Sequence, residues 1–146
     1  MPGYSIWYLL KPNHLLHDRV AEINTKLGLT PLPAHIPVLN NIQILSTAHG
    51  LFQSYNKKEK PIFTFAKRPM FLSFETEKRV SMKLDCKEQF RSWEFPVLSR
   101  KQMFFHDEVA EVSFDQDVIL PEEYDLVIMD TRYLDKRLWK PIDGRL

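Results

Sequence analysis

The first forty residues predict the order strand, helix, strand, and this order limits the folds open to the chain. Apart from Ser5, residues 4–10 are aromatic or aliphatic, as expected of a buried strand. The apolar residues that follow recur at spacings of four, three and four, so they share one side of a helix. They are Leu16, Val20, Ile23 and Leu27. Asn13 stands where a helix cap is expected and Gly28 where a helix ends, and a strand at residues 35–39 follows a proline-rich connection.

The remainder of the chain predicts a second helix followed mainly by strands. Ser46 is placed to cap a helix that reaches Tyr55. Alternating apolar residues between positions 62 and 84 predict a meander of two or three strands, with turns at 67–69 and 75–78. The later segments are a short helix and loop at 87–98, two strands or one bulged strand at 103–105 and 110–114, a connector at 121–123, a strand at 124–129 and a short polar segment at 134–138. This order predicts an α+β fold with mostly antiparallel sheets and helices on the outside.

The composition predicts one domain, residues 1–146, that is soluble and monomeric. With 20 Lys and Arg against 19 Asp and Glu, the net charge of +1 favours neither a nucleic-acid coat nor an anionic membrane surface. No apolar stretch approaches the roughly 20 residues that span a bilayer, and residues 1–11 lack the features of a signal peptide. The single Cys86 has no internal disulfide partner, and the clustered ligands of a zinc site are missing from the sequence. We therefore expect a reducing, cytoplasmic compartment.

Two tetrapeptides 76 positions apart share one pattern. Residues 35–38 are His-Ile-Pro-Val and residues 111–114 are Glu-Val-Ser-Phe. Successive side chains of a strand point to opposite faces, so the second and fourth residues of each tetrapeptide can face a core. Two such strands side by side would bring an imidazole, a carboxylate and a hydroxyl into one cleft, those of His35, Glu111 and Ser113. Groups of these kinds move protons and hold phosphate oxygens.

The order of these elements resembles the 2H phosphoesterase superfamily, also called LigT-like, and in particular its cyclic nucleotide phosphodiesterase branch. The resemblance covers nearly the whole chain and implies a bilobal, pseudo-symmetric α+β fold with one His-x-Thr/Ser-x motif in each lobe. It also implies chemistry on a 2′,3′-cyclic phosphate or a related phosphodiester, without a metal or another cofactor. In that chemistry the two histidines act as acid and base and the two hydroxyls hold the phosphate oxygens.

Each motif keeps one of the two family positions. The first keeps His35 and has Pro37 where the family has Thr or Ser, whereas the second keeps Ser113 and has Glu111 where the family has His. The resemblance implies that His35 donates a proton to the leaving oxygen, that Glu111 takes one from water and that Ser113 holds a phosphate oxygen. His106 is an alternative second imidazole if a bulge or turn directs it into the cleft; otherwise it ends a strand at the surface.

Further side chains are candidates for binding the substrate. Aromatic faces stack on nucleobases, and the candidates are Trp7, Tyr8, Tyr133 and Trp139, although such residues are more often part of a core. Pro37 would line the same site. Lys67, Arg68 and the basic run at 132–140 could contact phosphates, although charged turns are usually only solvated. The other histidines are expected to be solvated or to serve in packing; they are His14, His17 and His49.

Three functions fit the sequence. The first is a phosphodiesterase for a cyclic nucleotide or an RNA 2′,3′-cyclic phosphate end. The second is a binding module of the same fold that holds such a nucleotide or RNA end without turnover. The third is a structural or protein-interaction domain. The first two share the cleft, and they differ in whether a second proton-transfer group reaches the substrate.

Overall fold

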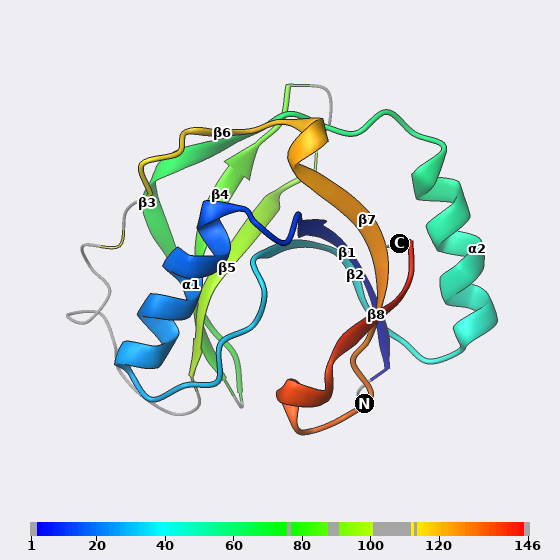
Figure 1. The fold of residues 1–146 in the computed structure, drawn as a ribbon, viewed down its shortest axis with the longest axis horizontal. Coiled ribbons are helices and arrows are strands. Elements are labelled where there is room, and N and C mark those ends of the chain that lie inside the picture. Colours follow the sequence, from blue (N-terminus) through cyan, green and yellow to red (C-terminus); the bar gives the residue numbers. More distant parts are fainter. Residues whose placement is uncertain (1–2, 76, 88–90, 101–111, 113, 145–146) are drawn as a thin grey trace.

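The computed structural model describes residues 3–75, 77–87, 91–100, 112 and 114–144. In this part of the chain, two α-helices and two antiparallel four-stranded sheets form an α+β fold (Figure 1), which confirms the predicted class. The first sheet has the order β2-β1-β7-β8 and contains β1 (Tyr4–Leu10), β2 (His35–Ile42), β7 (Tyr124–Asp130) and β8 (Lys140–Asp143). The second sheet has the order β5-β4-β3-β6 and contains β3 (Phe63–Ser73), β4 (Lys78–Asp85), β5 (Trp93–Arg100) and β6 (Val118–Ile119). The helices are α1 (Leu15–Lys26) and α2 (Leu45–Asn56), and the 3₁₀ helices η1 (Pro121–Glu123) and η2 (Lys136–Leu138) precede and follow β7.

The first sheet combines strands from both ends of the chain, whereas the second uses its middle. Helix α2 packs on β7 and β1 of the first sheet, and α1 packs on β5 of the second. In Figure 1 the two sheets stand side by side and α2 covers the outer side of the first. The sheets meet where β2 lies close to β5, and there the Arg91 side chain donates a hydrogen bond to the Val38 carbonyl.

Strand β1 lies between β2 and β7, and all seven of its residues are buried. Its side chains alternate between two clusters. Ile6 and Tyr8 belong to the main core, whereas Trp7 and Leu9 pack on the other face with Val127 and others. Burial on both faces explains why this strand is apolar without the alternation of a half-exposed one.

An aromatic cluster in the main core joins the two sheets. Tyr8 and Tyr124 come from the first sheet, and their rings meet edge to face with centroids 4.8 Å apart. Phe63 and Trp93 come from the second sheet, with centroids 5.3 Å apart, and both rings also contact Tyr8. Such aromatic pairs contribute about 1 kcal/mol each beyond the area they bury. The cluster therefore holds the sheets together at one end of their interface.

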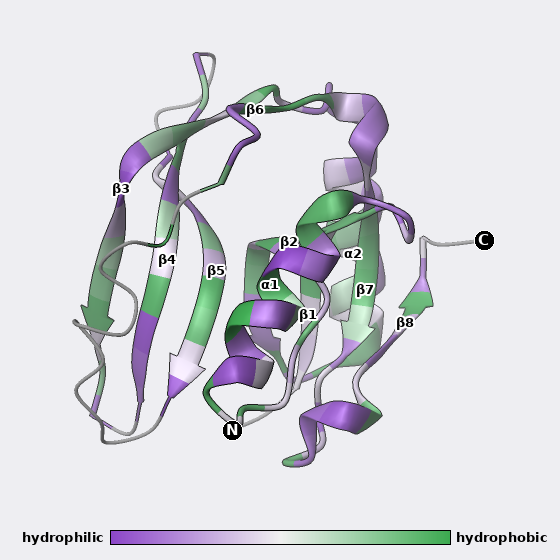
Figure 2. Ribbon diagram, turned by 60° about the vertical axis from the view of Figure 1, so that its left-hand side comes forward, coloured by the Kyte–Doolittle hydropathy of each residue, from purple (hydrophilic) through white to green (hydrophobic). Residues whose placement is uncertain are grey.

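Helix α1 follows the predicted pattern, but its cap is not the predicted residue. Leu16 and Val20 are buried, and Figure 2 shows both hydrophilic and hydrophobic residues on this helix, as expected when one side is covered. The N-cap is His14 rather than Asn13: its Nδ1 accepts the Leu16 N–H at 3.1 Å. Its Nε2 donates to Glu123 at 2.9 Å, so this ring is partly buried rather than solvated. Gly28, with a φ of 72°, ends the helix as predicted.

Several predicted boundaries are wrong. Helix α2 begins at Leu45 and has Ile44 as its N-cap, so Ser46 lies within the first turn. Residues 67–69 form no turn, because β3 continues through them with a bulge that absorbs the irregular register. The turn at 75–78 is confirmed by a 2.7 Å bond from the Phe74 N–H to the Glu77 carbonyl, so the meander has two strands.

The predicted helix and loop at 87–98 is also wrong, because residues 93–100 form β5. Trp93, Phe95 and Val97 are buried at every second position, which is the strand period, and β5 pairs antiparallel with β4. Strand β7 is confirmed at Tyr124–Asp130. The connector at 121–123 is a 3₁₀ helix, and β8 was not predicted.

The second tetrapeptide is described only at Val112 and Phe114, neither of which lies in a strand. Both face the core as predicted: Val112 is 9% exposed, and Phe114 stacks on Phe65 with centroids 5.5 Å apart. The strand predicted at 103–105 lies outside the described residues. Each α-helix in the described ranges has 12 residues, and none of them could cross a membrane.

Candidate functional site

His35, the first residue of β2, is buried against Trp7 of β1. The His35 side chain is on the face of the sheet that Trp7 and Leu9 share, and the residue is 5% exposed. Its ring stacks on the Trp7 ring with centroids 3.6 Å apart and an interplanar angle of 15°. Its Nδ1 lies 2.7 Å from the Pro33 carbonyl oxygen. A carbonyl only accepts, so Nδ1 carries the hydrogen, and a neutral ring then has its lone pair on Nε2.

The environment of His35 keeps its ring uncharged. Burial lowers the pKa of His35 from 6.5 to about 4, and the charges of Arg79 and Lys136 act in the same direction. The hydrogen bond to Pro33 opposes this shift without cancelling it. At neutral pH the free protein therefore presents a neutral imidazole. Its Nε2 can accept a proton but has none to donate.

A second histidine, His17 of α1, holds the backbone next to His35 in place. Its Nε2 donates to the Leu10 carbonyl at 2.8 Å, and its Nδ1 accepts the Ala34 N–H at 2.9 Å. Both ring nitrogens are thus bonded to backbone, at the end of β1 and just before the start of β2. The prediction that His17 is solvated is wrong, since this ring ties two strand ends together. Of the two histidines, only His35 keeps a nitrogen free of hydrogen bonds to the described residues.

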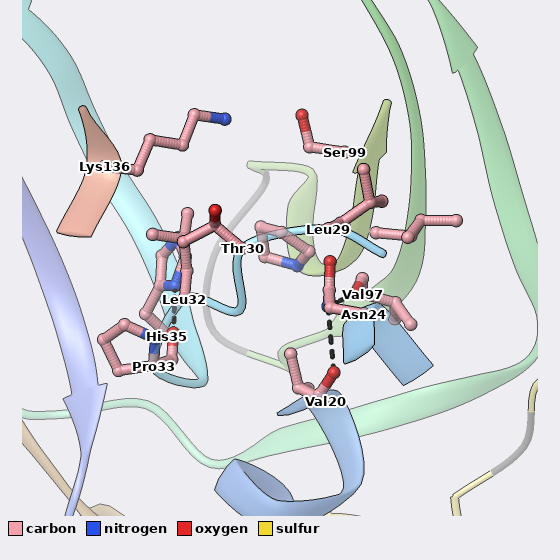
Figure 3. Close-up of a pocket in the computed structure, with 12 residues that line it drawn as sticks. Val20, Asn24, Leu29, Thr30, Leu32, Pro33, His35, Val97, Ser99 and Lys136 are labelled. Atoms are coloured by element: carbon pink, nitrogen blue, oxygen red, sulfur yellow. Dashed lines mark hydrogen bonds between the residues drawn. The ribbon is translucent and has the colours of Figure 1, made fainter. Parts of the chain in front are cut away.

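His35 lines a cleft between the two sheets. A cavity of about 560 Å³ is lined from the first sheet and its connections by Ser5, Trp7, Leu32, His35, Pro37, Asn40, Asn41, Thr131, Lys136 and Trp139. The second sheet and its β3–β4 turn contribute Phe74, Glu77, Arg79, Pro96 and Ser99. A smaller cavity of about 180 Å³ adjoins it beside α1 and shares His35, Lys136 and Ser99 with it. Figure 3 shows His35 and Lys136 on one side of the smaller cavity, with the Lys136 ammonium group directed toward Ser99.

The two cations of the cleft differ in how far they are neutralised. Arg79 lies between two carboxylates, with its Nε 2.9 Å from Glu77 and its Nη1 3.3 Å from Glu94. Lys136 has no carboxylate within 4.0 Å among the described residues, and its Nζ lies 5.7 Å from the centroid of the Trp139 ring. Lys136 is therefore the cation that can meet an anionic group without breaking an ion pair.

The aromatic side chains of the cleft are positioned by their own hydrogen bonds. Trp7 donates from Nε1 to Asn40 at 3.2 Å, while His35 covers one face of its ring. Trp139 donates from Nε1 to the Tyr133 carbonyl at 2.8 Å and is tilted against Trp7 at a centroid distance of 6.0 Å. Tyr133 is 39% exposed and does not line the cavity. Trp139 is thus better placed than Tyr133 to contact a planar ligand.

Two hydroxyls at the base of the cleft belong to one hydrogen-bonded chain. The Thr131 hydroxyl donates to the Gly3 carbonyl. Since its only hydrogen is used there, the Ser5 hydroxyl, 2.9 Å away, donates to Thr131. Both hydroxyl hydrogens are therefore used within the fold. Neither Ser5 nor Thr131 can donate a hydrogen bond to a phosphate oxygen, although both keep the capacity to accept one. The hydroxyl of Ser99, across the cleft, has no such bond to the described residues.

The structure thus brings together four of the predicted site residues: His35, Trp7, Pro37 and Trp139. The other predicted catalytic residues, Glu111, Ser113 and His106, lie outside the described residues. Sequence reasoning missed Arg79 and Ser99, which reach the cleft only because β4 and β5 stand opposite β2. Ser5 is two positions before Trp7 on β1, so strand alternation was a signal that could have found it. Asn40 lines the same cleft beside Pro37. Lys136 lies in the basic run that the sequence singled out.

The described residues contain no cluster of three or more His, Cys, Asp or Glu side chains that could hold a metal ion. Comparison of the chain with models of known protein families, with curated proteins and with solved structures finds no match. The functional interpretation therefore depends on the geometry of the cleft itself.

Proposed function

We propose that the cleft binds and hydrolyses a cyclic phosphodiester, either a cyclic nucleotide or an RNA end with a 2′,3′-cyclic phosphate. One observation carries this proposal: a buried, uncharged His35, whose Nε2 has no hydrogen bond to the described residues, lines a cavity between two sheets that Lys136 also lines. This arrangement agrees with the resemblance of the sequence to 2H phosphoesterases. On this proposal the two sheets correspond to the two lobes of that pseudo-symmetric fold.

His35 begins the reaction as the proton acceptor. Its Nε2 takes a proton from water as the water oxygen forms a bond to phosphorus, and the bond from phosphorus to a ribose oxygen breaks. The leaving oxygen must receive a proton, and the groups that the sequence offers are a protonated Glu111 or His106. This assigns His35 the role of base in the free enzyme, whereas the sequence alone suggested that it is the acid. The reason is its low pKa, which an ordinary exposed histidine does not have.

Binding depends on the groups around His35. The ammonium group of Lys136 supplies a charge for the phosphate, and Ser99 supplies a hydroxyl donor. The Trp139 ring offers a surface for a base. A volume of about 560 Å³ lies within the range of about 300 to 1,000 Å³ that small-ligand sites have. Lys136 and Ser99 thus replace the phosphate contact that Pro37, lacking a donor, cannot make.

A second candidate is a binding module of the same fold that holds a nucleotide or RNA end without turnover. Pro37 favours it, because it replaces a hydroxyl that holds phosphate in the active family members that the sequence resembles. For either candidate we expect a monomer in a reducing, cytoplasmic compartment, consistent with a single partly buried Cys86.

The test is an assay of the purified chain in EDTA with 2′,3′-cyclic nucleotides, RNA ending in a 2′,3′-cyclic phosphate, and cyclic dinucleotides. We expect linear product with wild type and none with His35→Ala. The matched control is His49→Ala, since His49 lies on α2, pairs with Asp143 at 2.8 Å and does not line the cleft. Product formed equally by His35→Ala would refute the proposed mechanism.

A thermal-shift measurement with the same ligands separates the two candidates. A ligand that binds the folded state raises the unfolding midpoint according to its occupancy, whether or not it is cleaved. A shift without product supports the binding module. Neither a shift nor product with any of these ligands refutes both candidates and favours a structural or protein-interaction domain.

A further inference from the structure

A second pocket lies on the opposite face of β1 from the cleft. Trp7 lines the cleft, and the next residue, Tyr8, points to the other side, where it joins Tyr55, Lys58, Arg91 and Trp93. We call these five residues the basic aromatic pocket, and its cavity has a volume of about 290 Å³. It lies beside the aromatic cluster that joins the sheets, and the cleft shares none of its lining residues.

The basic aromatic pocket holds two cations that have no anionic partner among the described residues. Lys58 Nζ lies 4.9 Å from the centroid of the Tyr55 ring, and the Arg91 guanidinium lies 4.5 Å from that of Trp93. Arg91 also donates to the Val38 carbonyl, which anchors its guanidinium group at the junction of the sheets. No carboxylate of the described residues lies within 4.0 Å of either cation. Each cation thus lies over the face of an aromatic ring, and both cations line the same cavity.

Two hydrogen-bond donors of the pocket have no acceptor among the described residues, and one of them, the Trp93 Nε1, is a fully buried atom. Tyr8 is 4% exposed, and its hydroxyl has no hydrogen-bond partner among the described residues. Burial raises the pKa of Tyr8 above its ordinary value of 10.0, so the hydroxyl keeps its proton at neutral pH. Trp93 is 3% exposed, and its Nε1–H also lacks a partner within the described part of the chain. A buried donor without an acceptor costs free energy, so the Trp93 N–H favours a ligand that supplies one, and the Tyr8 hydroxyl can donate to the same ligand.

We infer that the basic aromatic pocket binds a phosphate group, either as inorganic phosphate or as the phosphate of a small organic monoester. An ammonium, a guanidinium, a protonated phenol and an indole N–H are all donors, and phosphate offers several acceptor oxygens with up to two negative charges. The cavity of about 290 Å³ is close to the lower limit of small-ligand sites, about 300 Å³. This site is independent of the proposed hydrolysis in the cleft.

The experiment is an NMR titration of the full chain with inorganic phosphate at low ionic strength, followed at the indole N–H of Trp93. Trp93→Phe assigns that resonance among the three tryptophans. We expect a saturable shift in wild type and about a tenfold or greater loss of affinity in Lys58→Gln and Arg91→Gln, because each removes a charge-assisted contact. The matched control is Lys57→Gln, which removes the same charge from an exposed neighbour outside the pocket and should bind phosphate like wild type.

Two further variants test whether phosphate binds in the basic aromatic pocket and not in the cleft. Tyr8→Phe removes only the unpaired hydroxyl, so it should fold and bind phosphate several-fold more weakly. Lys136→Gln removes the free cation of the cleft, and the response of Trp93 should persist in it. Because Arg91 also bonds to β2, the thermal midpoint of Arg91→Gln is measured first, and Lys58→Gln carries the test if that variant unfolds.

Titration with adenosine 5′-monophosphate distinguishes the sources of the phosphate group. Tighter binding of the monoester than of inorganic phosphate would identify a phosphorylated organic ligand, and equal binding would identify the phosphate group alone. The inference is overturned if Trp93 shows no saturable shift at millimolar phosphate. It is equally overturned if Lys58→Gln and Tyr8→Phe bind like wild type, or if Lys136→Gln abolishes the response.

Discussion

The two faces of β1 present different chemistry although their residues are neighbours in the sequence. On the cleft face, Trp7 stacks on a neutral imidazole, and within the described part of the chain the Nε2 of this imidazole has no hydrogen bond and Lys136 has no carboxylate partner. On the other face, Tyr8 leads to a pocket of hydrogen-bond donors with two cations. A proton acceptor is suited to general-base chemistry, whereas a set of donors is suited to holding an anion. One buried strand can thus line two cavities of different chemistry because its side chains alternate.

The largest expected effect is on the cleft face. His35→Ala should lower the rate of hydrolysis of a 2′,3′-cyclic nucleotide by about 10² to 10⁴, the usual contribution of a general acid or base. The phosphate response of Trp93 should be unchanged in the same variant, because His35 does not line the second pocket. Parallel loss of both signals would contradict the separation of the two faces and would point to a general failure of folding.

The next effect is the dependence of stability on pH. His35 has a pKa of about 4 in the folded protein and an ordinary value of 6.5 when unfolded, so the unfolded chain takes up this proton first as the pH falls. The stability linked to His35 is complete above pH 6.5 and is lost progressively down to about pH 4. The linked loss is about 3 kcal/mol, from 1.36 kcal/mol per pKa unit.

Urea unfolding across this pH window measures that loss in wild type and in His35→Gln. Carboxylates titrate in both proteins, so the difference between the two curves isolates His35. The variant should lose less stability than wild type on acidification. Superimposable slopes would show that His35 is not held neutral, and with it the role of proton acceptor would fail.

A smaller effect on stability is expected from His17, which holds the backbone next to His35 in place. His17→Ala removes two backbone hydrogen bonds, to Leu10 and Ala34, and should lower the free energy of unfolding by about 2 kcal/mol. Because Ala34 precedes His35, turnover should also fall. His49→Ala is the control: its ion pair with Asp143 is exposed, so its loss should cost less than about 1 kcal/mol. Equal stability of the two variants would contradict the structural role of His17.

The smallest expected effect is a difference in stability between two hydroxyl deletions, one on each face of β1. Tyr8→Phe deletes a hydroxyl without a hydrogen-bond partner among the described residues and should change stability by less than about 1 kcal/mol in either direction. Ser5→Ala deletes a hydroxyl that bonds to Thr131 and should destabilise by about 1 kcal/mol. Chemical denaturation of both variants measures the difference. A larger loss in Tyr8→Phe than in Ser5→Ala would show that the Tyr8 hydroxyl is already satisfied within the fold.

Local patterns predicted much of the fold. The apolar run of β1, the helical spacing of Leu16 and Val20, and Gly28 at the helix end identified β1 and α1, because they depend on period and backbone conformation. The strand period of β5 is present in the sequence as well, and the predicted helix and loop at 87–98 does not account for it. His14 was missed as a cap because its acceptor role depends on Glu123, which is distant in the sequence.

The amino-acid sequence by itself determined that β1 is buried, that Leu16 and Val20 share the covered side of a helix and that His35 begins a strand, since apolar periodicity acts over a few residues. Only the tertiary structure decided that Arg79 and Ser99 face His35 across a cleft, and that Tyr8 meets Lys58 and Arg91. It also decided the charge state of His35, because desolvation and neighbouring charges depend on segments distant in the chain. The chemistry of both sites is therefore a property of packing between the two sheets, which no local pattern encodes.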